Sequence, residues 1–369
     1  MHVNNCIKHY IKLVKNEEKT RMQNIPMMLK GKGNILVILL PVISFIVPLL
    51  ILYSLYSYSF VQAYQGRTLH LFFLWLVSLE IILNWEKLQT NKINRLGSVR
   101  TILLVIGLLF PTIYVIIGNY YGLNTMIENL AMQNNVQEHW ALLIPLSFEY
   151  IVFAVIFGLV ILLIYGIERL TDFSIPIFFS GIIGILFTID NLYPYGRLTP
   201  FQIFVPATAT LAANVLNLMG YQTVFSIGRD PYYGYMPYLI ARDPQNPFRI
   251  AAFGIAWPCA GIESFIIYTV TILLFLKKTN ISRVHMVIYF AIGAVVTYFV
   301  NVLRVVSIFL IAMDNGYPSL PAQQFHDFYG PLYSIAWIIS YPLIIMGSQI
   351  LWSKIKVGNN IKIPLKLST

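Results

Sequence analysis

The chain is poor in charge: only 11% of its 369 residues are Asp, Glu, Lys or Arg, and 57% are hydrophobic. A soluble domain carries about 25% charged residues, so this chain has too few ionisable side chains to cover a water-soluble globule of its size. The composition excludes a cytosolic enzyme, a disordered chain and a nucleic-acid-binding protein. The net charge of +10 then reports orientation in a membrane, because Lys and Arg collect in cytoplasmic loops.

Several chemical signatures are also missing. Two cysteines, Cys6 and Cys259, are too few for a disulfide scaffold, and on opposite sides of a membrane they cannot pair. No HExxH, CxxC or paired-His spacing indicates a metal site, and no GxxxxGK[ST], GxGxxG or GxSxG motif occurs. We therefore expect no metal and no cofactor. The first apolar run begins near Asn34, too late for a cleaved signal peptide.

The dominant feature of the chain is a series of long apolar runs. They lie at about 34–56, 69–85, 99–119, 141–165, 173–189, 199–219, 251–276, 284–313 and 331–352. A membrane-spanning helix needs about 20 apolar residues, so most of these runs are long enough to cross a bilayer. They predict a multi-pass protein of the cell membrane.

The distribution of Lys and Arg predicts the orientation of these runs. The stretches that carry several basic residues are 1–33, 86–100, 277–283 and 353–369. The stretches 120–140 and 314–330 carry none. Because basic loops stay inside, we expect both termini to be cytoplasmic. Nine crossings would place the termini on opposite sides, so one run does not cross.

The run 199–219 is the best candidate for the segment that does not cross. Pro200 and Pro206 interrupt it, and it carries polar residues that include Asn214 and Asn217. A helix of this kind suits the membrane interface or a re-entrant path. Removing it from the count leaves about eight transmembrane helices.

The segment 190–250 is then expected outside. Short β-like runs at 223–227 and 236–241 indicate either an ordinary outer loop or a small β-rich cap over an outer site. The predicted fold is an all-α polytopic membrane protein with an outer interfacial helix and a small β-rich extracytoplasmic segment. Along the chain we expect a basic cytoplasmic leader (1–33), N-terminal transmembrane helices with about five spans (34–189), the extracytoplasmic segment (190–250), three catalytic transmembrane helices (251–352) and a basic cytoplasmic tail (353–369).

Three polar side chains are expected at the outer ends of the last three spans. Cys259 opens one span, Arg304 lies in the outer part of the next, and His326 shortly precedes the last. An arginine within a span costs at least about 2.5–3.5 kcal/mol on insertion scales, so it normally has a partner and a role. Each residue also has an ordinary explanation: a buried thiol, an arginine that snorkels or pairs with Asp314 or Glu263, and an exposed loop histidine.

Together the three residues suit a cysteine nucleophile. A neighbouring cation lowers a thiol pKa and raises the thiolate fraction. His326 can then act as an acid toward a leaving amine, and Arg304 can hold the oxyanion of a tetrahedral intermediate. Asn301, three residues earlier on the same helical face, is expected to orient Arg304. Asp314 and Asp327 are both candidates for orienting His326 or contacting a substrate.

Other polar residues leave other functions open. Glu80 and Glu149 lie within spans and, with Arg304, can line the path of a transporter or lipid flippase, although no internal repeat is evident. A structural membrane protein is a third possibility. His70 and His139 are predicted outer residues and are further candidate bases.

Three short motifs resemble the signature of the exosortase/archaeosortase family. They are Pro258-Cys259-Ala260-Gly261-Ile262-Glu263-Ser264, Asn301-Val302-Leu303-Arg304 and His326-Asp327. The family has a Cys-Ser/Ala/Thr-Gly-Ile element, an Asn-x-x-Arg element and a late His at the outer ends of successive spans. The segment 216–220 is similar to its leucine-rich interfacial helix end, and the resemblance covers about 199–345. Glu263 stands where bacterial members often have Arg, which favours the archaeal side of the family, including its thaumarchaeal type.

The resemblance implies a membrane-embedded cysteine transpeptidase. Family members are thought to cleave a C-terminal sorting tail, made of a short motif, a transmembrane helix and a basic end, from secreted or surface proteins at the outer membrane face. The new carboxyl end would pass to a membrane lipid. The implied roles are nucleophile for Cys259, transition-state stabiliser for Arg304, general acid and base for His326, and supporting or substrate-contacting residues for Asn301, Asp327, Glu263 and Ser264.

Overall fold

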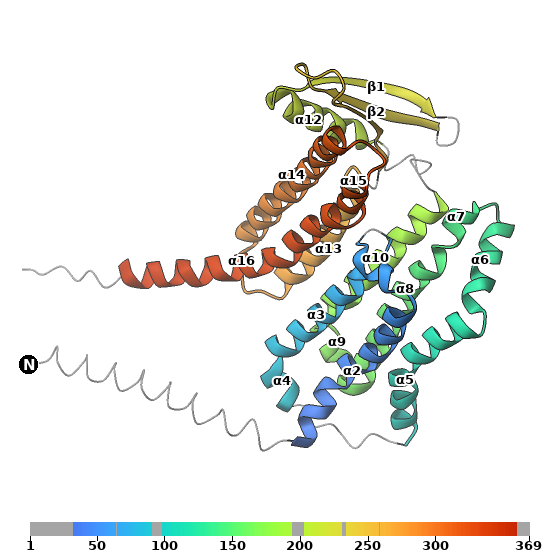
Figure 1. Cartoon of the computed structure of the whole chain (residues 1–369). Helices are drawn as coiled ribbons and strands as arrows, with labels where there is room; N and C mark the ends of the chain where they lie inside the picture. Colours follow the sequence, from blue (N-terminus) through green and yellow to red (C-terminus); the bar gives the residue numbers. More distant parts are fainter. Residues whose placement is uncertain are drawn as a thin grey trace, which may run out of the picture.

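The computed structural model describes residues 32–63, 65–90, 98–193, 203–230, 234–257 and 259–359. Residues 1–31 of the predicted leader and 360–369 of the predicted tail lie outside this description, as do Cys6 and Pro258. The described part is helical apart from one small sheet (Figure 1). Its elements form an N-terminal bundle, a C-terminal bundle and a cap over one end of the latter.

The N-terminal bundle consists of long apolar helices around an aromatic core. Its elements are α2 (Lys32–Leu55), η1 (Ser57–Val61), α3 (Thr68–Leu83), α4 (Trp85–Thr90), α5 (Ser98–Tyr120), α6 (Leu123–Gln133), α7 (Glu138–Ala141), α8 (Ile144–Tyr165), α9 (Ile167–Leu170) and α10 (Ser174–Leu192). The buried rings of Phe45, Phe73 and Phe157 meet edge to face, with centroids 5.3, 5.4 and 5.8 Å apart. The outer faces stay apolar, as at Leu50 and Ile102, which suits contact with lipid.

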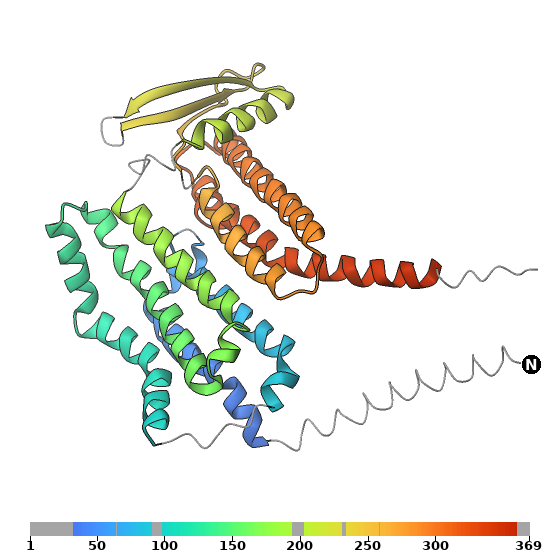
Figure 2. The ribbon, with the colours of Figure 1, turned by 180° about the vertical axis from the view of Figure 1, so that it is seen from behind.

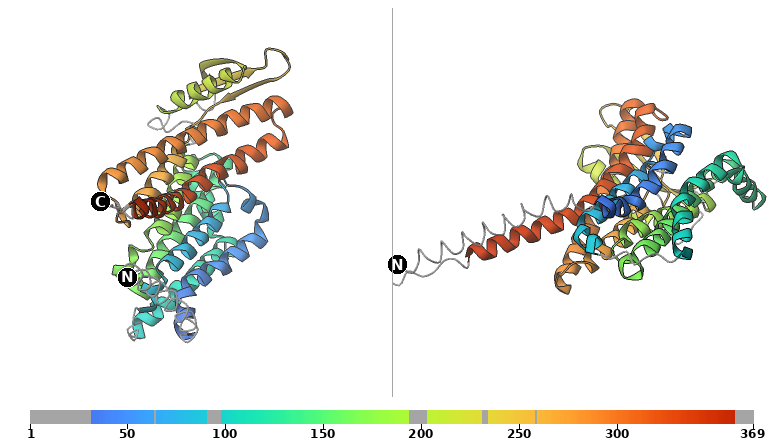
Figure 3. Two further views of the ribbon diagram at one scale, coloured as in Figure 1. Left: turned by 90° about the vertical axis from the view of Figure 1, so that its left-hand side faces the viewer. Right: turned by 90° about the horizontal axis from the view of Figure 1, so that it is seen from below.

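The C-terminal bundle contains fewer helices. They are α13 (Ile262–Lys277), α14 (Arg283–Asn315), α15 (Leu320–Gln324), the π-helical turn η3 (Phe325–Tyr329) and α16 (Gly330–Asn359). Two of them, α14 and α16, are longer than any helix of the N-terminal bundle. Helix α13 packs against α14 and α16 and also against α10, so it joins the two bundles. The last turns of α16 project away from both (Figure 3).

The cap is built from one helix and three strands. They are α12 (Val205–Leu218), β1 (Gln222–Asp230), β2 (Gly234–Arg242) and β3 (Ile250–Gly254), and the strands pair antiparallel in the order β1-β2-β3. Leu239 of β2 faces Phe225 on one side and Phe253 on the other. Leu239 shares a buried cluster with Leu216 of α12 and Val305 of α14, so the cap sits firmly on the end of α14 (Figure 2). The predicted β-rich segment is therefore confirmed.

Six helical stretches of the described residues are long and apolar enough to cross a membrane. Two further expected spans, 69–85 and 251–276, correspond to the 16-residue helices α3 and α13. The expectation for 251–276 is wrong at its start, because residues up to Gly254 form β3 and the helix begins only at Ile262. The predicted outer loop 120–140 also differs, since most of it forms α6 and α7. The chain is an all-α polytopic membrane protein with a small sheet, as predicted.

Candidate active site

Cys259 lies in the tight connection between β3 and α13. Asn301 of α14 donates from Nδ2 to the carbonyl oxygen of Cys259 at 3.1 Å, and Thr208 of α12 donates to that of Ala260, also at 3.1 Å. Gly261 has a φ of 86° and approaches α14 closely, because a Cβ there would lie 2.5 Å from Asn301 Cγ. Asn301 therefore holds the cysteine loop, and the expectation that it orients Arg304 is not what the contacts show.

His326 lies on the π-helical turn η3, directly opposite the thiol. Its Nε2 is 3.7 Å from Cys259 Sγ, and its Nδ1 is 2.7 Å from Asp327 Oδ1. The main chain of Asp327 is held in turn by the backbone N–H of Ala63, which donates to its carbonyl oxygen at 3.1 Å. Of the two predicted partners of His326, the structure selects Asp327, since Asp314 pairs with Arg249. Single π-turns within α-helices often occur at functional sites.

Arg304 of α14 is 7% exposed and contacts the main chain of the turn that carries His326. Its Nη2 donates to the carbonyl oxygen of His326 at 3.4 Å. Gly330, at the start of α16, makes room for it, because a Cβ there would lie 2.8 Å from Arg304 Nε. Among the described residues, no carboxylate forms an ion pair with Arg304, so a direct pairing with Asp314 or Glu263 is not seen.

The surroundings of Cys259 favour its thiolate. Burial alone would raise the pKa of the thiol, but the hydrogen bond from His326 and the positive charges of His326 and Arg304 oppose it. The balance holds the pKa of Cys259 below its usual value. A thiol with a lowered pKa beside an imidazole is the arrangement of a reactive cysteine.

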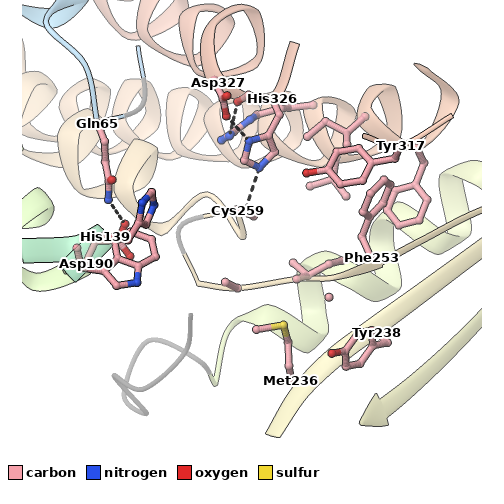
Figure 4. Close-up of a pocket in the computed structure, with 18 residues that line it drawn as sticks. Gln65, His139, Asp190, Met236, Tyr238, Phe253, Cys259, Tyr317, His326 and Asp327 are labelled. Carbon is pink, nitrogen blue, oxygen red and sulfur yellow. Dashed lines mark hydrogen bonds and ion pairs between the residues drawn. The ribbon is translucent and has the colours of Figure 1, made fainter. Parts of the chain in front are cut away.

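The thiol faces a cavity of about 470 Å³ where the two bundles and the cap meet (Figure 4). Val305, Ile308 and Phe309 of α14 make part of its wall apolar, and Tyr317 closes it beside His326. From the N-terminal bundle come Gln65, His139, Trp140 and Asp190, and from the cap come Met236, Tyr238 and Phe253. A cavity of this size and mixed lining is typical of a ligand site.

Sequence reasoning missed most of the wall from the N-terminal bundle. Gln65 donates to Asp190 Oδ2 at 2.7 Å, so a loop after η1 and the end of α10 meet at the cavity. Asp190 could have been found from the sequence, because it is an acidic residue at the outer end of an apolar run. No sequence pattern marks Gln65 or Trp140. His139, predicted as a candidate base, lines the cavity, but no hydrogen bond joins it to Cys259.

Other predicted residues lie apart from the thiol. Glu263 and Ser264, on the first turn of α13, border a second cavity of about 30 Å³ on another side of Arg304. His70 is fully buried and lies 2.8 Å from Glu149, so it is not a free base. Glu80 pairs with Lys278 at 2.7 Å. Within the described ranges, no cluster of His, Cys, Asp and Glu suits a metal ion.

Comparison with known proteins identifies the family of the chain. The family model described as transmembrane exosortase (Exosortase_EpsH) matches residues 61–344, which is most of the chain. The match begins well before the segment on which the sequence motifs lie and takes in the N-terminal bundle from α3 onward. It concerns the family as a whole, so an archaeal subtype stays a prediction. No curated protein and no solved structure is significantly similar. The chain therefore belongs to the transmembrane exosortase family, whose members are membrane sorting transpeptidases.

Proposed function

We propose that this protein is a cysteine transpeptidase that cleaves the C-terminal sorting tail of surface proteins and transfers the new carboxyl end to a membrane lipid. The observation that carries the proposal is the linear arrangement of Cys259, His326 and Asp327, with Sγ–Nε2 and Nδ1–Oδ1 distances of 3.7 and 2.7 Å. The family membership supports the reaction class.

The reaction follows from the positions of these groups. The Cys259 thiolate attacks the carbonyl carbon of the scissile peptide bond, and Arg304 stabilises the oxyanion that forms. His326, protonated and held by Asp327, gives its Nε2 proton to the leaving amine as the C–N bond breaks. The resulting thioester is attacked by a hydroxyl or amine of the lipid headgroup while His326 accepts the proton, and the thiolate leaves.

The charge distribution supports a site on the outer face. Lys277, Lys278 and Arg283 lie at the turn between α13 and α14, at the end of the C-terminal bundle opposite the cap (Figure 1). If this basic turn is cytoplasmic, then the cap and Cys259 face outward. A substrate tail with its own transmembrane helix would lie beside the bundle, so its scissile bond would be held at the depth of the thiol.

The three polar residues that could line a transport path, Glu80, Glu149 and Arg304, do not support a transporter. Arg304 lines the large cavity, but Glu149 is occupied by Arg67 and His70, and Glu80 by Lys278. Neither Glu80 nor Glu149 lines the cavity at Cys259 that Arg304 borders.

Replacement of the thiol tests the proposal. Cells that carry Cys259→Ala or Cys259→Ser should retain the tails of surface proteins that wild-type cells remove, as measured by mass spectrometry of protein C-termini. The other cysteine offers a matched control, and Cys6→Ala should process normally. A lipid mass on the new C-terminus distinguishes transfer from hydrolysis. Normal tail removal by Cys259→Ala would overturn the mechanism.

A further inference from the structure

Strand β3 leaves one backbone edge free. Asp243 N–H donates to Arg249 O at 3.0 Å, and Ile255 N–H donates to Pro237 O at 2.8 Å. Because bonded residues alternate along an antiparallel ladder, the odd-numbered residues from 249 to 255 pair with β2. Ala252 and Gly254 then point their N–H and C=O groups away from β2.

These outward groups are accessible. Ala252 and Gly254 are both exposed, and among the described segments none forms a backbone hydrogen bond with either residue. An unpaired strand edge is a template for another strand, and proteins normally cover or blunt it. In the described part of the chain, the edge is short and no segment pairs with it.

The free edge continues directly to the nucleophile. Phe253, Gly254, Ile255 and Ala256 all line the cavity that contains the thiol, and Cys259 follows five residues after β3 ends (Figure 4). The ring of Phe253 packs against that of Tyr317, 4.9 Å away, and Tyr317 lies near His326 (Figure 4). A chain laid along this edge would therefore enter the cavity and pass the thiol.

Resting on the function proposed above, we propose that the sorting tail binds in extended form as a fourth strand on the free edge of β3. Backbone hydrogen bonds to Ala252 and Gly254 would supply affinity without reading sequence, as in other cases of strand addition. Successive side chains of a strand point to opposite sides. Every second side chain of the tail near the scissile bond would thus contact the apolar wall formed by Val305, Ile308 and Phe309. This contact favours apolar residues at alternate positions of the tail.

A proline at the edge tests this binding mode. Ala252→Pro removes an outward N–H and leaves the ladder to β2 intact, and edge strands accept proline at such a position. The matched control Ala252→Ser keeps the N–H. The probe is a surface protein whose tail is retained in cells carrying Cys259→Ala. The kcat/KM for removal of the probe's tail should fall about tenfold in Ala252→Pro, and the decrease in Ala252→Ser should be clearly smaller because the N–H is kept.

Two further measurements separate binding from folding and from the chemistry. Alkylation of Cys259 by iodoacetamide should proceed equally in both variants if the site is intact. Peptides of the probe's cleavage region, N-methylated at one residue each, should lose inhibition of the wild-type enzyme at alternate positions only. Equal processing by Ala252→Pro and Ala252→Ser, or an N-methyl effect without alternation, would overturn strand addition. The cysteine mechanism would survive that result, because it fails only if Cys259→Ala still removes tails.

Discussion

Buried charges in the N-terminal bundle are paired with one another. The carboxylate of Glu149 accepts hydrogen bonds from the Arg67 guanidinium at 2.9, 3.0 and 3.2 Å, and it lies 2.8 Å from His70 Nε2. Arg67 also lies over the ring of Tyr56, 4.5 Å from its centroid. The charges of this cluster are therefore paired with one another, and only the Nδ1 atom of His70 has no hydrogen-bond partner among the described residues.

The C-terminal bundle differs in this respect. Glu263 Oε1, Asn301 Oδ1 and Arg304 Nε are buried without a hydrogen-bond partner among the described residues. Buried polar groups are normally hydrogen-bonded, so each unpaired one in a native structure needs an explanation. Arg304 borders the cavity at Cys259, and a developing oxyanion would complete its hydrogen bonds. The difference teaches that paired buried charges here serve the fold, while incompletely paired ones mark the site.

Arg67→Ala gives the largest expected effect on stability. It would leave the Glu149 carboxylate buried without its cation, which lowers the free energy of unfolding by about 3–5 kcal/mol. Urea unfolding in detergent measures this change. The control Arg169→Ala removes a partly exposed ion pair with Asp172 and should cost less than about 1 kcal/mol. Equal stability of the two variants would contradict a stabilising role for the buried cluster of Arg67, His70 and Glu149.

Arg304→Ala should show the opposite pattern. Loss of an oxyanion donor costs roughly 10²–10³-fold in kcat, and abundance in the membrane should stay near that of the wild type because no ion pair is broken. Separate measurement of kcat and KM for tail removal distinguishes a loss of transition-state stabilisation, which lowers kcat, from a loss of substrate binding, which raises KM. If Arg304→Ala loses abundance in step with activity, the contrast between the bundles fails.

Gly330→Ala adds a single methyl group beside Arg304 and tests how strictly the position of its guanidinium matters. The new Cβ would lie 2.8 Å from Arg304 Nε and 2.9 Å from Phe325 O, so the guanidinium must shift. We expect tail removal to slow about tenfold, since small displacements of catalytic groups reduce rates steeply. Gly347→Ala, on the same helix with nothing within 4 Å of the new Cβ, should remain fully active. Identical activity of the two variants would contradict this.

The pH profile of Cys259 alkylation has the smallest expected change. Because His326 and Arg304 lower the pKa of Cys259, the thiolate should persist below the pKa of a free thiol, about 8.5, and disappear only as pH falls through the lowered value. His326→Ala removes the hydrogen bond and the charge, so the pKa rises and the profile moves to higher pH. Rates of iodoacetamide alkylation over a pH range that extends to both sides of the free-thiol pKa of about 8.5 measure the shift. An alkylation profile that is the same in His326→Ala and the wild type would show that His326 does not lower the pKa of Cys259.

The three central residues could be predicted because each is a polar exception at the end of an apolar run. Arg304 is costly within a span, and Cys259 and His326 are predicted at the same depth in the membrane. The predicted topology alone therefore indicated that the three residues lie close together. The helix–strand boundary near residue 254 could not be predicted, because the apolar run that begins at 251 is compatible with both structures. The hydrogen bond from Asn301 to the cysteine loop could not be predicted either, since helical spacing relates Asn301 to Arg304 but says nothing of the loop that α14 faces.

Composition and charge by themselves determined the membrane class, the apolar runs and the residues that demand an explanation, because burial in lipid penalises charge wherever it occurs. Only the tertiary structure decided which groups meet. Gln65, Asp190 and Trp140 come from loops and helix ends with no periodic pattern, and the packing of the two bundles through α13 brings them to the wall opposite Cys259. The open edge of β3 is likewise a property of strand order, which is set by pairing between segments and not by any one of them.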